Sequence, residues 1–178
     1  MTADILPFPG QMPYIADGIR VETLPVGVFK AKVSEDMKVS DLTFHMTLPK
    51  IPLGLLETVL NDFRRDLSHE AMVNIFYSRK ERYYYLARPT YTADKVSVHY
   101  AFGHTKDILV MQLHSHNTMP AVFSSVDNED EAATGLYAVL GELDTKHPKI
   151  CIRAGMEGAF KYLKVEDVFQ VPFDGAAA

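Results

Sequence analysis

Two histidines separated by one residue, His114 and His116, follow directly on the apolar run from Ile108 to Leu113. A short continuous apolar run of this kind is typical of a buried strand. Because successive side chains on a strand point to opposite faces, residues two apart lie on the same face, about 7 Å apart at Cα. The two imidazoles are therefore expected to lie together at the end of the strand, where they could share one metal ion.

Asp127 is the expected third ligand. Two histidines and one carboxylate leave a fourth tetrahedral position for water, which is the arrangement of catalytic rather than structural zinc. Zinc lowers the pKa of water from about 15.7 to about 7, and a base is still needed to move the proton to a leaving amine. Glu70 is the candidate for that base. These residues predict a mononuclear zinc hydrolase.

The spacing resembles the JAMM motif of the JAB1/MPN metalloproteases. In this chain the motif runs as His114-x-His116, ten further residues and Asp127, with Ser124 three residues before the aspartate and Glu70 some forty residues upstream. The resemblance implies that both histidines and the aspartate bind zinc and that Glu70 is the general acid and base. It also implies that Ser124 donates a hydrogen bond to the oxyanion of the tetrahedral intermediate.

The chain departs from that pattern at two positions. The family usually has Pro after the second histidine, and this chain has Asn117. Pro fixes φ and stiffens a turn, so its absence concerns the rigidity of the loop more than metal binding. The family also often has Gly three residues after the glutamate, where this chain has Val73.

Three segments narrow the resemblance: Ile51 to Leu56, Ile75 to Ser78 and Pro120 to Asp130. They are similar to the A-protein family of the bacterial cassette named for its ParB-related and ThiF-related members (PRTRC), over roughly residues 44 to 165. Such cassettes also carry a ubiquitin-like protein and a ThiF-related activating enzyme. The resemblance therefore implies a protease that trims or removes a ubiquitin-like partner, with the activating enzyme as a further member of the same pathway.

Each candidate residue also has a simpler structural interpretation. A single histidine on a strand is more often a hydrogen-bonded structural residue than a ligand, and the pairing with a spaced aspartate is what favours a metal. Ser124 followed by Asp127 also resembles a capping box, a role that is compatible with a helix N-terminus lying beside the metal. Glu70 could be a solvated residue that follows a helix.

Two other classes of protein need to be weighed. The first is a catalytically inactive scaffold of the same fold that only binds partner proteins; retention of all five motif side chains argues for an enzyme. The second is a zinc deaminase, which would need a His-x-Glu and a Pro-Cys-x-x-Cys, whereas this chain has one cysteine. That residue, Cys151, lies in an apolar stretch and is expected to be a buried small hydrophobe, not a fourth ligand.

Composition limits the possible partners and compartment. The chain has 178 residues, 47% hydrophobic and 23% charged, which suits one globular domain with a sizeable core. A net charge of −5 and the mixed signs of the cluster from Arg79 to Arg82 argue against nucleic-acid binding. No stretch approaches the ~20 apolar residues that span a bilayer, and no signal peptide is evident. We therefore expect a cytoplasmic protein without membrane or nucleic-acid partners.

The order of predicted elements indicates the organisation of the chain. Residues 1–45 form an N-terminal extension with short strands, residues 46–172 the JAB1/MPN metalloprotease domain and residues 173–178 a disordered tail. Prolines in residues 1–17 predict an extended lead-in. Alternating apolar residues predict strands over 19–22, 28–33 and 42–46.

In the larger domain, apolar residues at helical spacing after Pro52 predict a helix over residues 53–67. A second helix is expected over about 128–141, with Glu129, Asp130 and Glu131 in its first turn, where carboxylates interact favourably with the helix dipole. Strands are predicted over 71–77, 83–86, 96–100, 108–113, 149–154, 159–163 and 168–171. This order predicts an α/β fold with a central mixed β-sheet flanked by helices, as in the JAB1/MPN-like, cytidine-deaminase-like fold that the resemblance implies.

Overall fold

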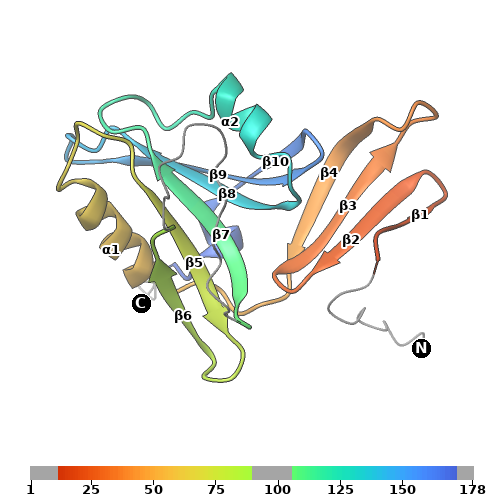
Figure 1. The fold of residues 1–178 in the computed structure, drawn as a ribbon, viewed down its shortest axis with the longest axis horizontal. Coiled ribbons are helices and arrows are strands. Elements are labelled where there is room, and N and C mark those ends of the chain that lie inside the picture. The colour runs from red at the N-terminus through yellow and green to blue at the C-terminus, as the bar shows by residue number, and fades with distance from the viewer. Residues whose placement is uncertain (1–11, 90–105, 172–178) are drawn as a thin grey trace, which may run out of the picture.

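The computed structural model describes residues 12–89 and 106–171. These residues form two β-sheets and three short helices, so the predicted α/β class is confirmed (Figure 1). The predicted strand over 96–100, the tail over 173–178 and most of the predicted lead-in lie outside the described residues.

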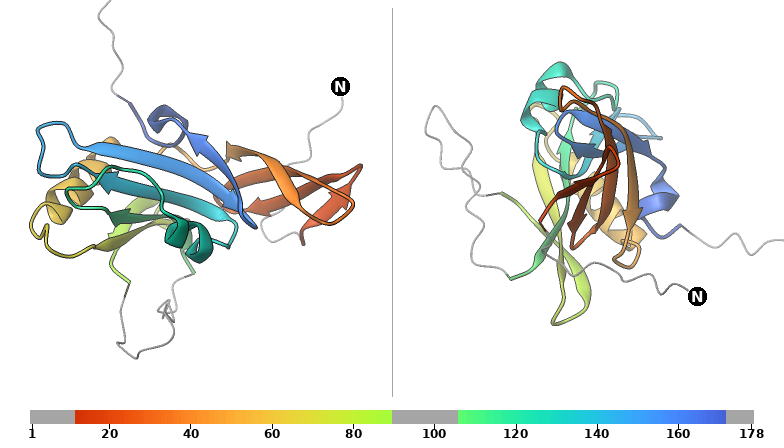
Figure 2. Two further views of the ribbon diagram at one scale, coloured as in Figure 1. Left: turned by 90° about the horizontal axis from the view of Figure 1, so that it is seen from above. Right: turned by 90° about the vertical axis from the view of Figure 1, so that its right-hand side faces the viewer.

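The N-terminal part of the chain forms a four-stranded antiparallel sheet in which each strand pairs with the next. Alternation builds it: in the third strand Phe29 and Ala31 are buried while Lys30 and Lys32 are exposed. Viewed from above (Figure 2, left), this sheet lies beyond one end of the second sheet, where its last strand contacts two strands of that sheet. Its strands are β1 (Tyr14–Ala16), β2 (Ile19–Leu24), β3 (Gly27–Val33) and β4 (Val39–Met46).

The second sheet has six strands in the order β10-β9-β8-β7-β5-β6. β7 and β8 run parallel, and the other neighbours in this sheet run antiparallel. A parallel pair needs a crossover connection, and the segment between β7 and β8 carries the helix α2 (Ser125–Asp130). The strands are β5 (Met72–Ser78), β6 (Tyr83–Ala87), β7 (Ile108–Ser115), β8 (Gly135–Gly141), β9 (Lys149–Met156) and β10 (Ala159–Leu163).

The prediction of one helix over residues 128–141 is wrong. α2 ends at Asp130, and the apolar residues that follow form β8, which is buried along nearly its whole length. A strand buried on both faces shows a continuous apolar run without alternation, so the run alone does not separate strand from helix. Gly135 and Gly141 bound this run, and its length of seven residues fits a strand.

Both faces of the larger sheet are covered. Alternate residues of β8 join two separate apolar clusters: Leu136, Ala138 and Leu140 belong to the main core, and Tyr137 and Val139 to a smaller cluster on the other face. The main core also takes in one face of the N-terminal sheet and the buried residues of α1 (Leu53–Phe63). The smaller cluster is covered by the segment between β7 and α2, with Phe123 at its centre.

Two further boundaries differ from the sequence predictions. α1 ends at Phe63 rather than at residue 67, so Glu70 lies in a connecting segment between α1 and β5. Residues 168–171 do not form a strand: Val168 ends the short helix α3 (Val165–Val168), and Phe169 makes a single bridge to Ile51.

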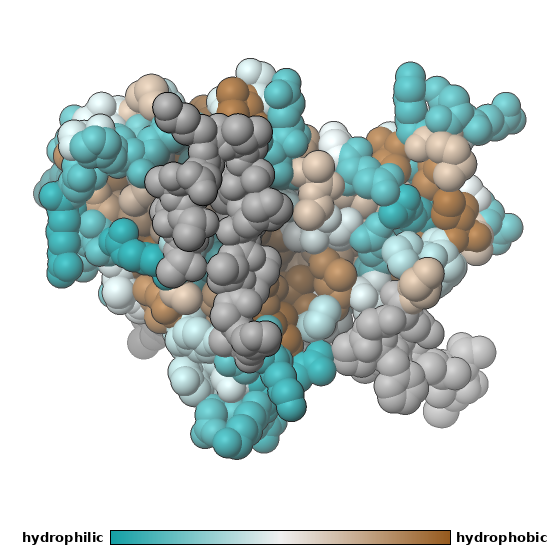
Figure 3. All heavy atoms as spheres, viewed as in Figure 1, coloured by the Kyte–Doolittle hydropathy of each residue, from teal (hydrophilic) through white to brown (hydrophobic). Residues whose placement is uncertain are grey.

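The cluster from Arg79 to Arg82 forms the exposed turn between β5 and β6, as its mixed charges predict, at the hydrophilic lower edge of Figure 3. Within the described ranges, the helices are all too short or too polar to cross a membrane.

Candidate metal centre

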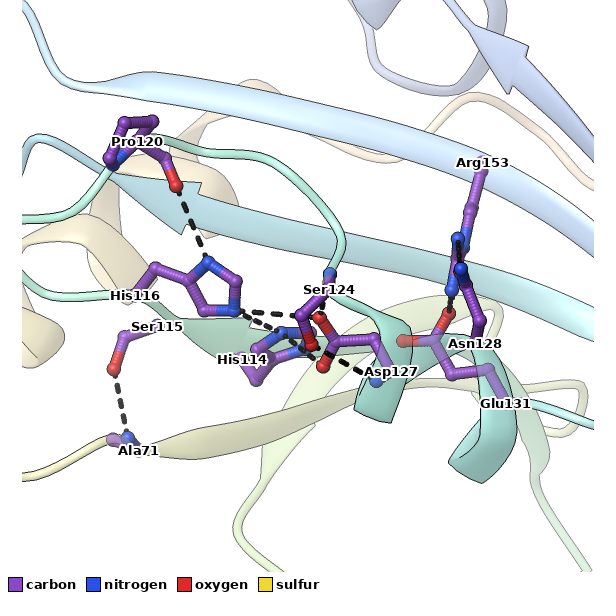
Figure 4. A network of polar contacts seen from close by, with 10 residues as sticks. All are labelled: Ala71, His114, Ser115, His116, Pro120, Ser124, Asp127, Asn128, Glu131 and Arg153. Carbon is purple, nitrogen blue, oxygen red and sulfur yellow. Dashed lines mark hydrogen bonds and ion pairs between the residues drawn. The ribbon is translucent and has the colours of Figure 1, made fainter.

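Three side chains converge where β7 ends (Figure 4). One ligand atom from each of His114, His116 and Asp127 lies within 4.8 Å of the others. The Nε2 atoms of the two histidines are 3.2 Å apart, and the Asp127 carboxylate oxygens lie 3.2 Å from Nε2 of His114 and 3.6 Å from Nε2 of His116. The structure thus brings together all three predicted ligands, from two segments of the chain.

These separations suit a single small cation. Ligand atoms 2.0–2.1 Å from a tetrahedral zinc ion are about 3.3 Å from one another. The observed contacts of 3.2, 3.2 and 3.6 Å lie close to that value, although the two contacts of Asp127 use different carboxylate oxygens. Two imidazole nitrogens and a carboxylate oxygen are also the donor set of catalytic zinc. The residues present therefore fit the metal that the sequence predicts.

Strand alternation places the histidines as expected. Leu113 and Ser115 are fully buried, whereas His114 and His116 belong to the opposite face, where the rings of His114 and Phe123 form a T-shaped pair. His116 lies just beyond the last residue of β7, and its N–H donates to the carbonyl of Leu140 on β8 at 2.7 Å. The second histidine is therefore fixed by the neighbouring parallel strand.

The turn after His116 has a backbone conformation that suits asparagine and excludes proline. Asn117 has φ of +52°, in the left-handed region that Pro cannot adopt because its ring holds φ near about −65°. Its side-chain oxygen accepts a hydrogen bond from the Ser115 hydroxyl at 3.1 Å, and its carbonyl accepts from the N–H of Leu143 at 2.9 Å. Asparagine therefore suits this turn conformation, and these two hydrogen bonds stiffen the turn in place of a proline ring.

The orientation of His116 depends on a backbone carbonyl. Its Nδ1 lies 3.3 Å from the carbonyl oxygen of Pro120, so an Nδ1–H donor there leaves the lone pair of Nε2 facing the other ligands. The loop that supplies this carbonyl passes over Gly141 at the end of β8. A Cβ at Gly141 would lie 2.4 Å from the carbonyl oxygen of Met119 and from the backbone nitrogen of Ala121. Glycine at this position is what permits the approach.

Asp127 is positioned by the start of α2. Ser124 is the N-cap, and the two residues form a reciprocal capping box: the Ser124 N–H donates to the Asp127 carboxylate at 2.5 Å, and the Asp127 N–H donates to the Ser124 hydroxyl at 3.2 Å. The carboxylate that caps α2 is thus also the one that lies beside the two imidazoles, as the sequence allows.

The predicted placement of the other acidic residues in the first turn of this helix is wrong. Asp127 is the acidic residue of that turn, whereas Glu129 and Asp130 lie at the C-terminal end of α2 and Glu131 is its C-cap. A carboxylate at a helix C-terminus gains nothing from the dipole. Glu131 instead accepts hydrogen bonds from Arg153. Burial raises the pKa of its carboxyl more than the guanidinium lowers it, and the net pKa is about 7.

The electrostatics of the site favour the metal-binding protonation states. Burial lowers the pKa of His114; the Asp127 carboxylate raises it, and His116 and Arg153 lower it again, with a net decrease. For Asp127, partial burial raises the pKa, but the Ser124 hydrogen bonds and the two imidazoles outweigh it, and the carboxyl stays below its ordinary value. A neutral imidazole and an ionised carboxylate are the forms that ligate.

Glu70 lies at the same end of the sheet but is not among the three converging ligands. Its neighbour Ala71 is tied to β7 by two hydrogen bonds: the Ala71 N–H donates to the buried Ser115 hydroxyl at 2.8 Å, and the Ser115 N–H donates to the Ala71 carbonyl at 2.9 Å. Ser115 is the residue between the two histidines, so the Glu70 backbone is held beside them. Glu70 itself is exposed.

Neighbouring candidates take other roles. His69, next to Glu70, contacts Asp66 at 3.2 Å from an exposed position. Cys151 is a free, partly buried thiol packed against the smaller apolar cluster. It is not one of the converging ligands among the described residues.

Sequence reasoning missed three residues that support the site: Pro120, Gly141 and Arg153. Pro120 acts through its carbonyl and Gly141 through the side chain it lacks, so neither carries a compositional signal. Arg153 is an arginine inside an apolar strand with only 1% of its surface exposed, and its position there was a signal that could have been used.

Comparison with models of known protein families and with curated proteins finds no match to this chain. Assignment of its activity therefore depends on the residues of the site and on the resemblance of its motif.

Proposed function

We propose that the chain is a zinc-dependent metallopeptidase of the JAB1/MPN type, which hydrolyses a peptide or isopeptide bond at the C-terminus of a ubiquitin-like protein. The observation that carries the proposal is the convergence of His114, His116 and Asp127 within 4.8 Å, on the strand end and helix start where the motif predicts them. The JAB1/MPN fold is part of this proposal.

Zinc in this site would supply a Lewis acid and a water molecule whose pKa is lowered from about 15.7 to about 7. Glu70 removes the proton from the attacking water and passes it to the leaving amine as the carbon–nitrogen bond breaks. Glu70 is exposed, and its neighbour Ala71 is hydrogen-bonded to Ser115 between the two histidines, so the carboxylate is accessible to solvent and substrate close to the metal ligands. Proton transfer by a positioned carboxylate contributes typically about 10²–10⁴-fold to the rate.

Ser124 donates a hydrogen bond to the oxyanion that develops on the substrate carbonyl. Its hydroxyl oxygen accepts from the Asp127 N–H, and a hydroxyl that accepts still has its own proton to donate. Removal of such a donor costs about 2.7–4 kcal/mol in other enzymes. No covalent acyl-enzyme is required, since water is the nucleophile.

The substrate class follows from the resemblance of the motif and of the three longer segments. A ubiquitin-like protein or its conjugates is the substrate, and a ThiF-related activating enzyme is a further partner in the same cytoplasmic pathway. The extended C-terminal tail of the substrate would satisfy its backbone groups by adding to a strand edge.

The test is hydrolysis of ubiquitin-like proteins extended beyond a C-terminal glycine, with and without a chelator. We expect one zinc ion per chain after purification, cleavage after the glycine, and loss of cleavage on chelation with recovery on adding zinc. Glu70→Gln should keep the zinc and lose cleavage. Purified protein that neither contains nor takes up zinc would instead support the inactive scaffold, and full turnover by Glu70→Gln would show that the base is another residue.

A further inference from the structure

Arg153 lies on β9, outside the three ligands, yet its contacts surround the segment that carries Asp127 (Figure 4). Its Nη1 donates to the side-chain oxygen of Asn128 at 2.6 Å. Its Nε and Nη2 both donate to one oxygen of Glu131, at 2.9 and 2.6 Å. Asn128 directly follows Asp127, and Glu131 is the C-cap of α2, so the guanidinium holds the C-terminal half of the helix.

The rings that stack on Arg153 extend this contact to the other end of the segment. The guanidinium carbon lies 3.7 Å from the centroid of the Phe123 ring and 3.7 Å from that of Phe160. Phe123 directly precedes Ser124, the N-cap of α2, and its ring contacts His114 edge-on with centroids 6.1 Å apart. A guanidinium between two aromatic faces gains both cation–π attraction and a fixed plane.

α2 has little else to hold it in place. The helix has six residues, none of which is buried. A helix this short is not stable by itself, and without buried apolar side chains it gains almost nothing from the hydrophobic effect. Its buried attachments are Phe123 before the helix and Glu131 after it, and both contact Arg153.

We propose that Arg153 is a positioning residue of the metal centre: from β9 it fixes α2, and with it the Asp127 carboxylate, against the histidines of β7. The inference rests on the proposed function, because it concerns the same three ligands. In the described part of the chain, the hydrogen bonds and ring contacts of Arg153 go to Asn128, Glu131, Phe123 and Phe160, none of which is a proposed ligand. Arg153 acts through Asn128, Glu131 and Phe123, as outer residues of metal sites orient the ligands that bind the ion.

The experiment compares wild type with two variants and a matched control. In Arg153→Met/Glu131→Met both buried polar partners become apolar with similar volume, which avoids leaving a buried carboxylate unpaired. Arg153→Lys keeps the charge but loses the planar fork, and it serves if the double variant does not fold. The control is Arg20→Met/Glu22→Met: Arg20 binds Glu22 at 2.6 Å on β2 in the N-terminal sheet and the half-exposed Glu157 at 2.8 Å.

Zinc affinity is measured by competition with a chromophoric chelator, and geometry by the visible absorption of the Co²⁺-substituted protein. We expect zinc affinity to fall about 10- to 100-fold in the double variant, with a smaller fall in Arg153→Lys. The Co²⁺ bands should shift in both, whereas Arg20→Met/Glu22→Met should keep the wild-type zinc affinity and the wild-type bands. In metal-free protein, amide exchange over residues 123–131 should be faster in the double variant than in the control.

A purely structural role would lower stability without moving the Co²⁺ bands. If the double variant binds zinc as tightly as the control and gives the same bands, Arg153 does not position the centre. If wild type itself binds no zinc in the same titration, the proposed function is overturned and this inference with it. The two failures are therefore distinguishable within one set of measurements.

Discussion

The two halves of the proposed metal centre are held by different means. His114 and His116 belong to the end of β7, which lies between β5 and β8 and is hydrogen-bonded on both sides. Asp127 belongs to a six-residue helix without a single buried residue. One half is fixed by backbone hydrogen bonds of a central strand, and the other by side chains that reach it from elsewhere in the chain.

Because of this difference, the two histidines are held in fixed positions, whereas the position of Asp127 can shift. A strand end between two neighbours cannot move without breaking ladder hydrogen bonds, so the positions of the histidines are set by the fold. The position of Asp127 depends on a capping serine and on Arg153. We therefore expect changes in the strand half to abolish the site or to misplace Glu70, and changes around α2 to weaken the site by degrees.

The largest expected effect is the removal of a strand ligand. His116→Ala should abolish zinc binding and hydrolysis together, a loss beyond the roughly 10- to 100-fold typical of outer residues. Zinc content after gel filtration and a zinc titration measure it. The control is His45→Ala, at an exposed position on β4, which should keep one zinc per chain. One tightly held zinc in His116→Ala would show that the ligand set is wrong.

Gly141→Ala tests the loop that orients His116. The added Cβ would lie 2.4 to 2.6 Å from backbone atoms of residues 119–121, and backbone cannot yield as a flexible side chain does. We expect a loss of about 3 kcal/mol in unfolding free energy, at the upper end for overpacking, and weaker zinc binding as the Pro120 carbonyl moves away. Denaturant unfolding and zinc titration measure the two effects.

The matched control for that loop is Gly54→Ala in the first turn of α1, where an added Cβ meets nothing within 4 Å. Alanine there should stabilise the protein by about 0.5 kcal/mol and leave zinc binding unchanged. Equal zinc affinities in both glycine variants would show that the loop over Gly141 does not orient His116 for zinc binding.

Ser115→Ala tests how the strand half positions Glu70. The variant loses the acceptor for the Ala71 N–H and the donor to Asn117, at a cost of about 1 kcal/mol because Ala71 is only partly buried. Zinc affinity should stay near wild type while kcat falls, since Ala71 adjoins the proposed base. Ser40→Ala, at an exposed position on β4, is the control. An unchanged kcat would show that the position of Glu70 does not depend on this hydrogen bond.

The strand half could be predicted from the sequence because its rule is local. Alternation within a single strand was enough to put His114 and His116 on one face, and the spacing of Ser124 and Asp127 was enough to suggest the capping box. The α/β class followed from the order of elements. The JAB1/MPN fold and the peptidase activity stay predictions.

The parts of the fold and the site that the sequence does not predict depend on contacts between distant segments. Nothing near Arg153 in the sequence indicates that its partner is Glu131, 22 residues earlier. The apolar run of β8 does not separate strand from helix, because burial on both faces removes the alternation that identifies strands. Gly141 matters only because another segment crosses it, which no local pattern records.

The smallest expected effect is the pH dependence of the metal-free protein. Burial in the strand half holds the pKa of His114 below its ordinary value of 6.5. Above 6.5 both folded and unfolded states are neutral at this residue, and its contribution to stability is complete. As the pH falls through 6.5 and then through the lower folded pKa, the unfolded state binds the proton first and the contribution is lost.

His114→Gln should therefore lose less stability than wild type between about pH 7.5 and about pH 5, as measured by denaturant unfolding in the presence of a chelator. Ser40→Ala, at an exposed position without a titratable group, is the control and should follow the wild-type curve. The same titration compares the two halves of the site, because the pKa of Asp127 lies below 3.8 and its contribution persists to lower pH than that of His114. A wild-type curve that matches His114→Gln would mean that burial at the end of β7 does not keep this imidazole neutral, and the fixed, metal-ready character assigned to the strand half would not hold.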